Sequence, residues 1–365
     1  MFKISEITSF LDEFAPSLLK ESYDNVGLLI GDKNDLLESI LLTLDITEKV
    51  IDEAISKKCN LIISHHPILF KSLKKIGTNT EEERIIRKAI KHDISIYASH
   101  TNLDNIKGGV NFKLAEKINL KNIKILNPKS NNINRIISFC PEEYKDLILN
   151  ELYKAGAGNI GNYKNCSYSS EGTGTFLPTE NANPFEGNIG IESKVKEVKI
   201  EVLVPNYLTD KVISALKKSH PYEEVAYYIH DTENTNQDTG IGAIGELENE
   251  IDEIEFLKYL KTVLPIDYIR HTELLNKKIK TVAVCGGSGA FLTKKAISEG
   301  ADVFISADFK YHDYFEAEKK ILIADIGHYE TEICTKELFY EVITKKFSNI
   351  VVLISDTVTK PYNYI

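Results

Sequence analysis

Short apolar runs alternate with amphipathic, helix-like stretches along the first third of the chain. Charged and apolar positions recur at helical spacing over 47–58 and 81–92, which predicts two amphipathic helices there. The same alternation returns in the last third of the chain. This pattern is typical of layered α/β folds. The apolar runs predict strands at 25–31, 39–45, 60–64 and 94–99, and again at 281–287, 301–307, 321–327 and 349–355.

The middle of the chain follows a different pattern. A loop-like boundary rich in Asn and Ser precedes it. Its elements are predicted in the order strand, helix, strand, strand, helix, strand, if 167–178 is counted as a strand, and this is the ferredoxin-like order. We therefore expect a discontinuous α/β core of residues 1–130 and 235–365, interrupted by an inserted α+β domain of residues 131–234.

A repeated spacing suggests that the two halves of the core are related. Ser56 and Ser64 are eight residues apart, and each follows an isoleucine. Ser298 and Ser306 repeat both features. Either an internal duplication or chance similarity between two helix–strand units would explain the match. If the halves are duplicated, we expect their strand ends to converge on one cleft about a pseudo-twofold axis.

Two adjacent imidazoles follow one of the predicted buried strands. These are His65 and His66, directly before Pro67. Neighbouring side chains of an extended segment point to opposite faces, so the pair would not normally share one ion. A bend at Pro67 would let each imidazole serve a different ion. The alternative is an ordinary core or surface role for both.

Two further clusters pair a histidine with an acid. His100 and Asp104 follow another predicted strand, and ligands gather beyond the carboxyl ends of strands in α/β sheets. A helix beginning just after Gly327 would place His328 and Glu332 one turn apart on one face. The alternatives are a turn or N-cap role for Asp104 and a helix-dipole role for Glu332.

The predicted strand ends together offer more ligands than one tetrahedral zinc needs. The set fits two divalent ions per subunit, with a carboxylate between them. Two such ions can activate water and neutralise a developing negative charge. We expect zinc, and manganese or iron would also suit these donors. The candidate ligands are His65, His66, Asp104, His328 and Glu332, with His100 in reserve.

Three other segments carry polar groups that could face the same cleft. Asp308, Lys310 and His312 occupy the counterpart of the double-histidine turn, as substrate-binding or proton-transfer groups or as an ordinary solvated turn. The Gly-rich turn at 285–290 could hold an anion through backbone N–H groups, but it lacks the dinucleotide-binding and P-loop patterns. The segment 23–27 is either a cleft wall or a turn before a strand.

Composition and charge narrow the class of protein. Hydrophobic residues make up 42% and charged residues 27%, as expected of a globular chain. The net charge of −10 argues against a protein that coats nucleic acid. Five scattered cysteines without a C-x-x-C pair argue against a zinc knuckle or a secreted disulfide framework. We found no signal-peptide pattern or membrane-spanning run, so we expect a reduced, cytoplasmic protein.

Six motifs in order give the chain a family resemblance. They are YDNVGLLIG, LIISHHPILF, SHTNLD, VCGGSGAFL, SADFKYHDY and DIGHYETE. With them the chain resembles the NIF-three-like proteins, also described as type 2 GTP cyclohydrolase I homologues. Tyr23 departs from the Trp that many members carry before Asp-Asn. The middle module, with HPYEEVAYYIHD, resembles the PII/CutA-like insertion of the longer members.

The resemblance implies a two-metal site with a defined division of ligands. It also implies ring-shaped homohexamers whose metal sites face an internal cavity. His100 would lie near the site rather than serve as a certain ligand. The implied ligands are His66 and Asp104 for one ion, His65 and His328 for the other, and Glu332 as the bridge.

The cyclohydrolase description implies attack of water on the imidazole ring of GTP. We therefore expect a metal-dependent hydrolase of a nucleotide-type or other small anionic substrate, with Glu332 as the bridge and His100 or His312 as the proton shuttle. The alternative is a non-catalytic metal-binding or regulatory ring, whose insert senses a ligand or partner. A phosphodiester or nucleic-acid substrate is a weaker third possibility, given the negative net charge.

Overall fold

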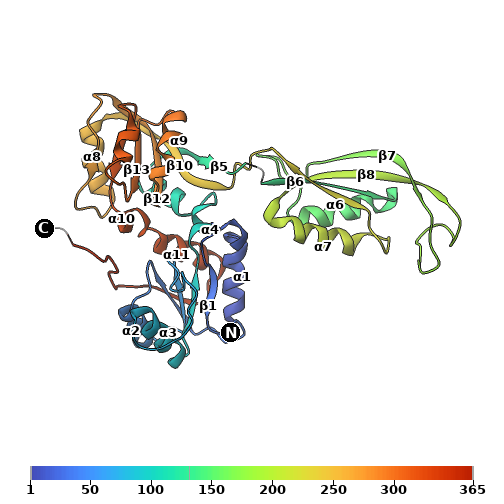
Figure 1. Ribbon diagram of the computed structural model, residues 1–365, viewed down its shortest axis with the longest axis horizontal. Coiled ribbons are helices and arrows are strands. Elements are labelled where there is room, and N and C mark those ends of the chain that lie inside the picture. Colours follow the sequence, from blue (N-terminus) through green and yellow to red (C-terminus); the bar gives the residue numbers. More distant parts are fainter. Residues whose placement is uncertain (1, 131, 364–365) are drawn as a thin grey trace. The chain divides into compact units, whose positions relative to one another are not determined.

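The structure, a computed structural model, describes residues 2–130 and 132–363. It divides into two compact units, which are drawn in Figure 1. The core unit comprises Met1–Asn127 and Asp238–Ile365, and the insert unit comprises Pro128–Gln237. Asn131, where the expected insert begins, lies outside the described residues, as do the expected outer ends of the core at 1 and 365.

The first sheet of the core unit has the strand order β1-β4-β3-β2-β15. β1 is antiparallel to β4, and the other neighbours are parallel. β2 and β3 are buried at every position, as expected of parallel strands covered on both faces, and this explains their continuous apolar runs. The strands are β1 (Gly27–Ile30), β2 (Ser39–Thr43), β3 (Leu61–Ser64), β4 (Ser95–Ala98) and β15 (Val351–Ile354).

Two amphipathic helices pack their apolar faces on this sheet. They are α2 (Glu48–Ser56) and α3 (Glu81–Lys91), close to the predicted ranges. α3 begins with a capping box, in which the Thr80 hydroxyl accepts a hydrogen bond from the Glu83 N–H at 3.1 Å. Their buried residues join those of the sheet in one apolar cluster, which includes Val50, Ile51, Ala54, Ile85, Ile86, Ile62 and Ile96.

The second sheet of the core unit has the order β11-β14-β13-β12-β10-β5. The sequence pattern predicted its three parallel strands but not β5, β10 or β11. β10 was missed because exposed acidic residues interrupt the apolar positions in its second half. It pairs antiparallel to β12. The strands are β5 (Lys121–Pro128), β10 (Gly240–Asp252), β11 (Arg270–His271), β12 (Lys278–Ser288), β13 (Val303–Ala307) and β14 (Leu322–Asp325).

Both core sheets contain the same four-strand topology. β1-β4-β3-β2 in one sheet corresponds to β11-β14-β13-β12 in the other, and in each an antiparallel edge strand precedes three parallel ones. The serine spacing falls on matching strands, because Ser64 lies in β3 and Ser306 in β13. The repeated topology therefore supports the internal duplication.

The remaining helices of the core unit connect or cover these sheets. α10 begins directly after Gly327, as the sequence predicted. The helices are α1 (Ile4–Phe14), α4 (Thr101–Asp104), α5 (Val110–Lys117), α8 (Glu253–Val263), α9 (Thr293–Ser298), α10 (His328–Glu332) and α11 (Thr335–Lys346). No helix within residues 2–130 and 132–363 combines the length and the apolar character that a membrane crossing requires.

The insert unit has the predicted ferredoxin-like order of elements. Its four strands form an antiparallel sheet in the order β7-β8-β6-β9. Two helices pack on one face of this sheet around a buried apolar cluster. The elements are β6 (Ile133–Cys140), α6 (Lys145–Lys154), β7 (Ser167–Phe176), β8 (Ser193–Pro205), α7 (Thr209–Ser219) and β9 (Tyr227–Thr232). The α/β core with an inserted α+β domain is therefore confirmed as the fold class.

Candidate metal centre

The double-histidine turn at the end of β3 directs both imidazoles into one space. The His66 N–H donates to the Leu44 carbonyl at 3.0 Å, and the Ser64 hydroxyl donates to the His66 carbonyl at 2.8 Å. These bonds bend the chain out of the extended conformation at this point. The rings of His65 and His66 consequently lie 5.1 Å apart between centroids, instead of on opposite faces of a strand.

Four imidazoles of this region are anchored through the same ring nitrogen, Nδ1. Their Nε2 atoms are thereby left for a ligand. Carboxylates and carbonyls orient metal-binding histidines in this way. The contacts join His65 Nδ1 to the Ser99 carbonyl at 2.9 Å, His66 Nδ1 to Asp45 at 2.6 Å, His100 Nδ1 to Asp24 at 2.9 Å and His328 Nδ1 to Asp308 at 2.7 Å.

The Glu332 carboxylate lies between these rings. It is buried, and its Oε2 atom is 3.0 Å from the Nε2 atoms of both His66 and His328. Its Oε1 atom is 3.8 Å from His65 Nε2. Glu332 and His328 lie at opposite ends of α10, one turn apart, as the sequence predicted. One carboxylate thus faces three imidazoles from different parts of the chain.

The Gly-rich end of β12 makes room for this carboxylate. Gly287 has a φ of +61°, and a Cβ there would lie 2.3 Å from Glu332 Oε1. The Gly287 N–H donates to the Thr331 hydroxyl at 2.9 Å, and the Gly286 N–H donates to the Asn111 side chain at 2.8 Å. These two N–H groups are therefore used within the fold, and the turn is not shaped to hold an anion through them.

Buried polar atoms at the centre lack hydrogen-bond partners among the described residues. Among them are His65 Nε2 and Asp104 Oδ1, which lie 3.8 Å apart. Buried polar groups are normally hydrogen-bonded, so two neighbouring atoms without partners call for an explanation. A divalent cation held by nitrogen and oxygen donors would satisfy both atoms. The residues present therefore fit a metal.

The structure brings the five expected ligands and His100 together. The potential ligand atoms of His65, His66 and His100 all lie within 4.8 Å of one another, and so do those of His66, His328 and Glu332. Asp104 joins them through its contact with His65. These histidine and glutamate clusters are compatible with metal binding.

The segment after β13 contributes less to the centre than expected. Asp308 reaches it, but as the anchor of His328. The backbone N–H of Lys310 donates to Asp313 at 2.8 Å. The ring of His312 packs against two exposed aromatic rings, those of Tyr311 and Phe315.

Sequence reasoning missed the groups that hold the histidines. Asp45 lies two residues beyond the end of β2, so its place at a strand end was an available signal. Asp24 lies in the segment 23–27, for which the sequence allows either a cleft wall or a turn. Thr359 donates to Asp45 Oδ2 at 2.5 Å from the C-terminal tail, and nothing in the local sequence marks it.

The contacts of His66 and His328 favour the protonated forms of these two imidazoles when no metal is bound. Burial alone would lower the pKa of His66, but hydrogen bonds to Asp45 and Glu332 outweigh it and raise this pKa to about 9. Burial is likewise outweighed at His328, where hydrogen bonds to Asp308 and Glu332 raise the pKa to about 11. Both rings are therefore in the positively charged imidazolium form at neutral pH.

The two buried carboxyl groups respond in opposite directions. Burial, assisted by the nearby charge of Glu332, raises the pKa of Asp104 well above its usual value. Burial would also raise the pKa of Glu332, but hydrogen bonds from the surrounding imidazoles outweigh it and hold this pKa well below its usual value. Glu332 is accordingly the more acidic of these two carboxyl groups.

We expect zinc binding at pH 7 to release protons. A metal-binding imidazole must be neutral, so His66 and His328 must each lose a proton, which gives at least about two protons per subunit. Calorimetric titration in buffers of different ionisation enthalpy measures this number. Affinity should also fall as the pH is lowered. A binding heat that does not depend on the buffer would contradict the prediction.

The chain that carries this centre is similar to proteins of one family. Residues 2–361 match the DUF34/NIF3 model, described as Duf34/NIF3 (NGG1p interacting factor 3). A GTP cyclohydrolase 1 type 2 homolog of Bacillus subtilis is 39% identical over 366 residues, covering 99% of this chain and 98% of the relative. A Bacillus cereus protein related to NIF3 superposes with a TM-score of 0.86 at 37% identity, covering 100% of this chain and 99% of that one. For Staphylococcus aureus protein SA1388 the TM-score is 0.78 at 34% identity, with the same coverage. The expected resemblance is thus confirmed, and the chain belongs to the DUF34/NIF3 family.

Proposed function

We propose that the protein is a metal-dependent hydrolase of a small anionic substrate of the nucleotide type. The observation that carries this proposal is the convergence of imidazoles on one buried carboxylate, beside buried polar atoms such as His65 Nε2 and Asp104 Oδ1 that lack hydrogen-bond partners among the described residues. GTP is the first candidate substrate, because the similar Bacillus subtilis protein is named a GTP cyclohydrolase 1 type 2 homolog.

The proposed site holds two divalent ions, zinc first, with manganese or iron as alternatives. Glu332 suits the bridging position, because its oxygens reach three imidazoles. When bound, such ions lower the pKa of water and neutralise negative charge that develops during hydrolysis. The proposed ligands are His66 and Asp104 for one ion and His65 and His328 for the other.

His100 is the proposed proton-transfer group. Asp24 fixes its Nδ1 atom, and its potential ligand atom lies within 4.8 Å of those of His65 and His66. It can therefore exchange a proton with a group bound at the centre while its ring keeps one orientation. His312 is a weaker candidate for this role, since its ring packs against Tyr311 and Phe315.

The family resemblance also supports a proposal about assembly. We expect a toroidal homohexamer whose centres face an internal cavity. From the scattered cysteines we propose a reducing, cytoplasmic location. Light scattering coupled to size-exclusion chromatography tests the hexamer directly. A monomeric mass at micromolar concentration would contradict it.

We expect metal-loaded protein to convert GTP, and the Glu332→Ala variant to show no conversion above background. The reason is that removing the central carboxylate takes away the proposed bridge. The measurement is a screen of the zinc-, manganese- and iron-loaded protein against nucleotides and phosphoesters, with the variant as the blank. Equal rates in both proteins would show that the observed turnover does not come from this centre.

A cavity in the insert unit favours a second candidate function, that of a ligand-sensing assembly. It has a volume of about 360 Å³, and its lining includes the rings of Phe176, Phe185 and Tyr222. Phe185 and Tyr222 lie 5.9 Å apart between centroids. Full metal content without turnover of any tested substrate would favour this function over the first.

A further inference from the structure

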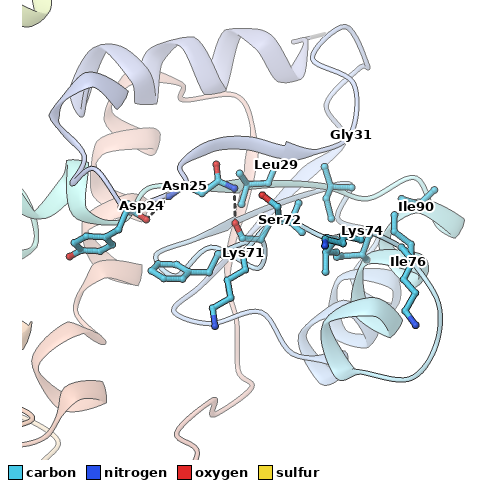
Figure 2. Close-up of a pocket in the computed structure, with 16 residues that line it drawn as sticks. Asp24, Asn25, Leu29, Gly31, Lys71, Ser72, Lys74, Ile76 and Ile90 are labelled. Carbon is cyan, nitrogen blue, oxygen red and sulfur yellow. Dashed lines mark hydrogen bonds between the residues drawn. The ribbon is translucent and has the colours of Figure 1, made fainter.

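A groove of about 840 Å³ lies in the core unit between β1 and the loop that follows the double-histidine turn. One wall comprises residues 23–25 and part of β1, and the other comprises residues 69–76. Figure 2 shows Asp24 and Asn25 toward one end of it, and Ile76 and Ile90 at the other. Its volume is within the range of small-molecule sites.

One end of this groove adjoins the candidate metal centre. Asp24 lines the groove and also anchors His100 at 2.9 Å. The ring of Phe70 lies 6.4 Å from that of His100 and 6.2 Å from that of Tyr23. A molecule in the groove would therefore meet two aromatic rings directly beside the imidazole cluster.

The groove is positively charged although the chain as a whole carries a net charge of −10. Lys71, Lys74 and Lys75 line it within five positions of one loop. None of them forms an ion pair with a described acidic side chain. Asp24 is the one acidic residue of the lining, and its carboxylate is already bonded to His100. Three lysines are thus available for an anion.

The lining between the lysines and β1 is mostly apolar. Leu29, Ile86 and Ile90 contribute to it. The Asn25 side chain donates to the Leu69 carbonyl at 2.6 Å and so fastens the lysine-bearing loop to the opposite wall, as Figure 2 shows. The tethered loop therefore presents its lysines to the groove, and β1 and α3 supply apolar surface beside them.

We propose that this groove binds the substrate of the proposed hydrolase, and that the substrate is a phosphorylated molecule with a flat ring. The inference rests on the proposed function. Its phosphates lie along Lys71, Lys74 and Lys75, since lysines bind phosphate as compact charges. Its ring stacks on Tyr23 and Phe70, whose faces suit any flat π-system. The ring, and not the phosphates, is then nearest to the metal centre.

The first test measures GTP binding by calorimetry with zinc-loaded full-length protein. A triple variant, Lys71→Gln, Lys74→Gln and Lys75→Gln, should bind GTP about tenfold more weakly, because each exposed pair contributes about a factor of two. The matched control replaces three exposed lysines elsewhere in the core unit and removes the same charge. The control substitutions are Lys121→Gln, Lys258→Gln and Lys277→Gln, which should leave GTP affinity within about twofold.

The second test separates the phosphates from the ring. Phe70→Ala should weaken binding of GTP but leave binding of pyrophosphate unchanged, whereas the triple variant should weaken both. Three results would overturn the groove proposal. The first is an equal loss of GTP affinity in the triple variant and its control, and the second is an equal effect of Phe70→Ala on the binding of GTP and pyrophosphate. The third is no GTP binding to the unchanged protein. Binding through the lysines without any conversion of GTP would support the groove and count against the proposed hydrolase.

Discussion

Replacing Glu332 with alanine is expected to remove nearly all bound metal. The variant deletes the one carboxylate that faces the imidazoles of His65, His66 and His328. Loss of a group that merely orients a ligand lowers metal affinity by about 10- to 100-fold, so loss of a direct ligand should exceed about 100-fold. Elemental analysis of protein dialysed against a fixed zinc concentration measures the effect.

Two controls make this result specific. Glu273→Ala removes the same charge from a side chain that is 83% exposed, and it should leave the metal content unchanged. Glu332→Gln keeps the size of the side chain and removes its charge, so it should also lose metal if the negative charge is required. A correctly folded Glu332→Ala protein with full metal content would exclude the proposed bridge.

Replacing Asp24 with alanine is expected to lower the free energy of unfolding by about 3–5 kcal/mol. The carboxylate is buried and accepts hydrogen bonds from the Thr101 N–H at 3.0 Å, from the Thr101 hydroxyl and from His100. The alanine variant would leave those donors buried without partners. Urea unfolding of the metal-free protein measures the difference.

The pH dependence of this contribution has a definite sign. Burial would raise the pKa of Asp24, but the hydrogen bonds from His100 and Thr101 outweigh it and hold the pKa far below its usual value. A depressed carboxyl pKa stabilises the fold above the unfolded value, about pH 4, and this stabilisation is lost as the pH falls further. Asp24→Ala should therefore differ most from the unchanged protein near neutral pH. A difference below about 1 kcal/mol there would contradict a structural role for Asp24.

The parallel strands of the core could be predicted because burial on both faces leaves a simple mark in the sequence. β2, β3 and β13 are buried at every position and therefore appear as continuous apolar runs. β10 and β5 carry exposed positions and lie at or next to the sheet edge, so their runs are short and broken. Edge strands depend on pairing with a neighbour more than on a local apolar pattern.

The candidate site, like the fold, could be predicted only in part from the sequence. Its donors were recognisable because histidines and acids directly after buried strands are unusual, as at His65 and His66. Their anchors were not, because Asp45 and Thr359 are ordinary polar residues whose contact joins positions 314 apart in the chain. Only the folded backbone brings such groups within hydrogen-bond distance.

The amino-acid sequence by itself determined the layered core, the ferredoxin-like insert and the set of groups able to hold a cation. These features follow from local periodicity and residue chemistry, which need no knowledge of distant contacts. Tertiary structure alone decided that His65 and His66 face one space and that the missing side chain of Gly287 leaves space for Glu332. It also decided that a lysine-lined groove opens beside His100. Each of these depends on how separate segments pack, and packing is a property of the whole fold.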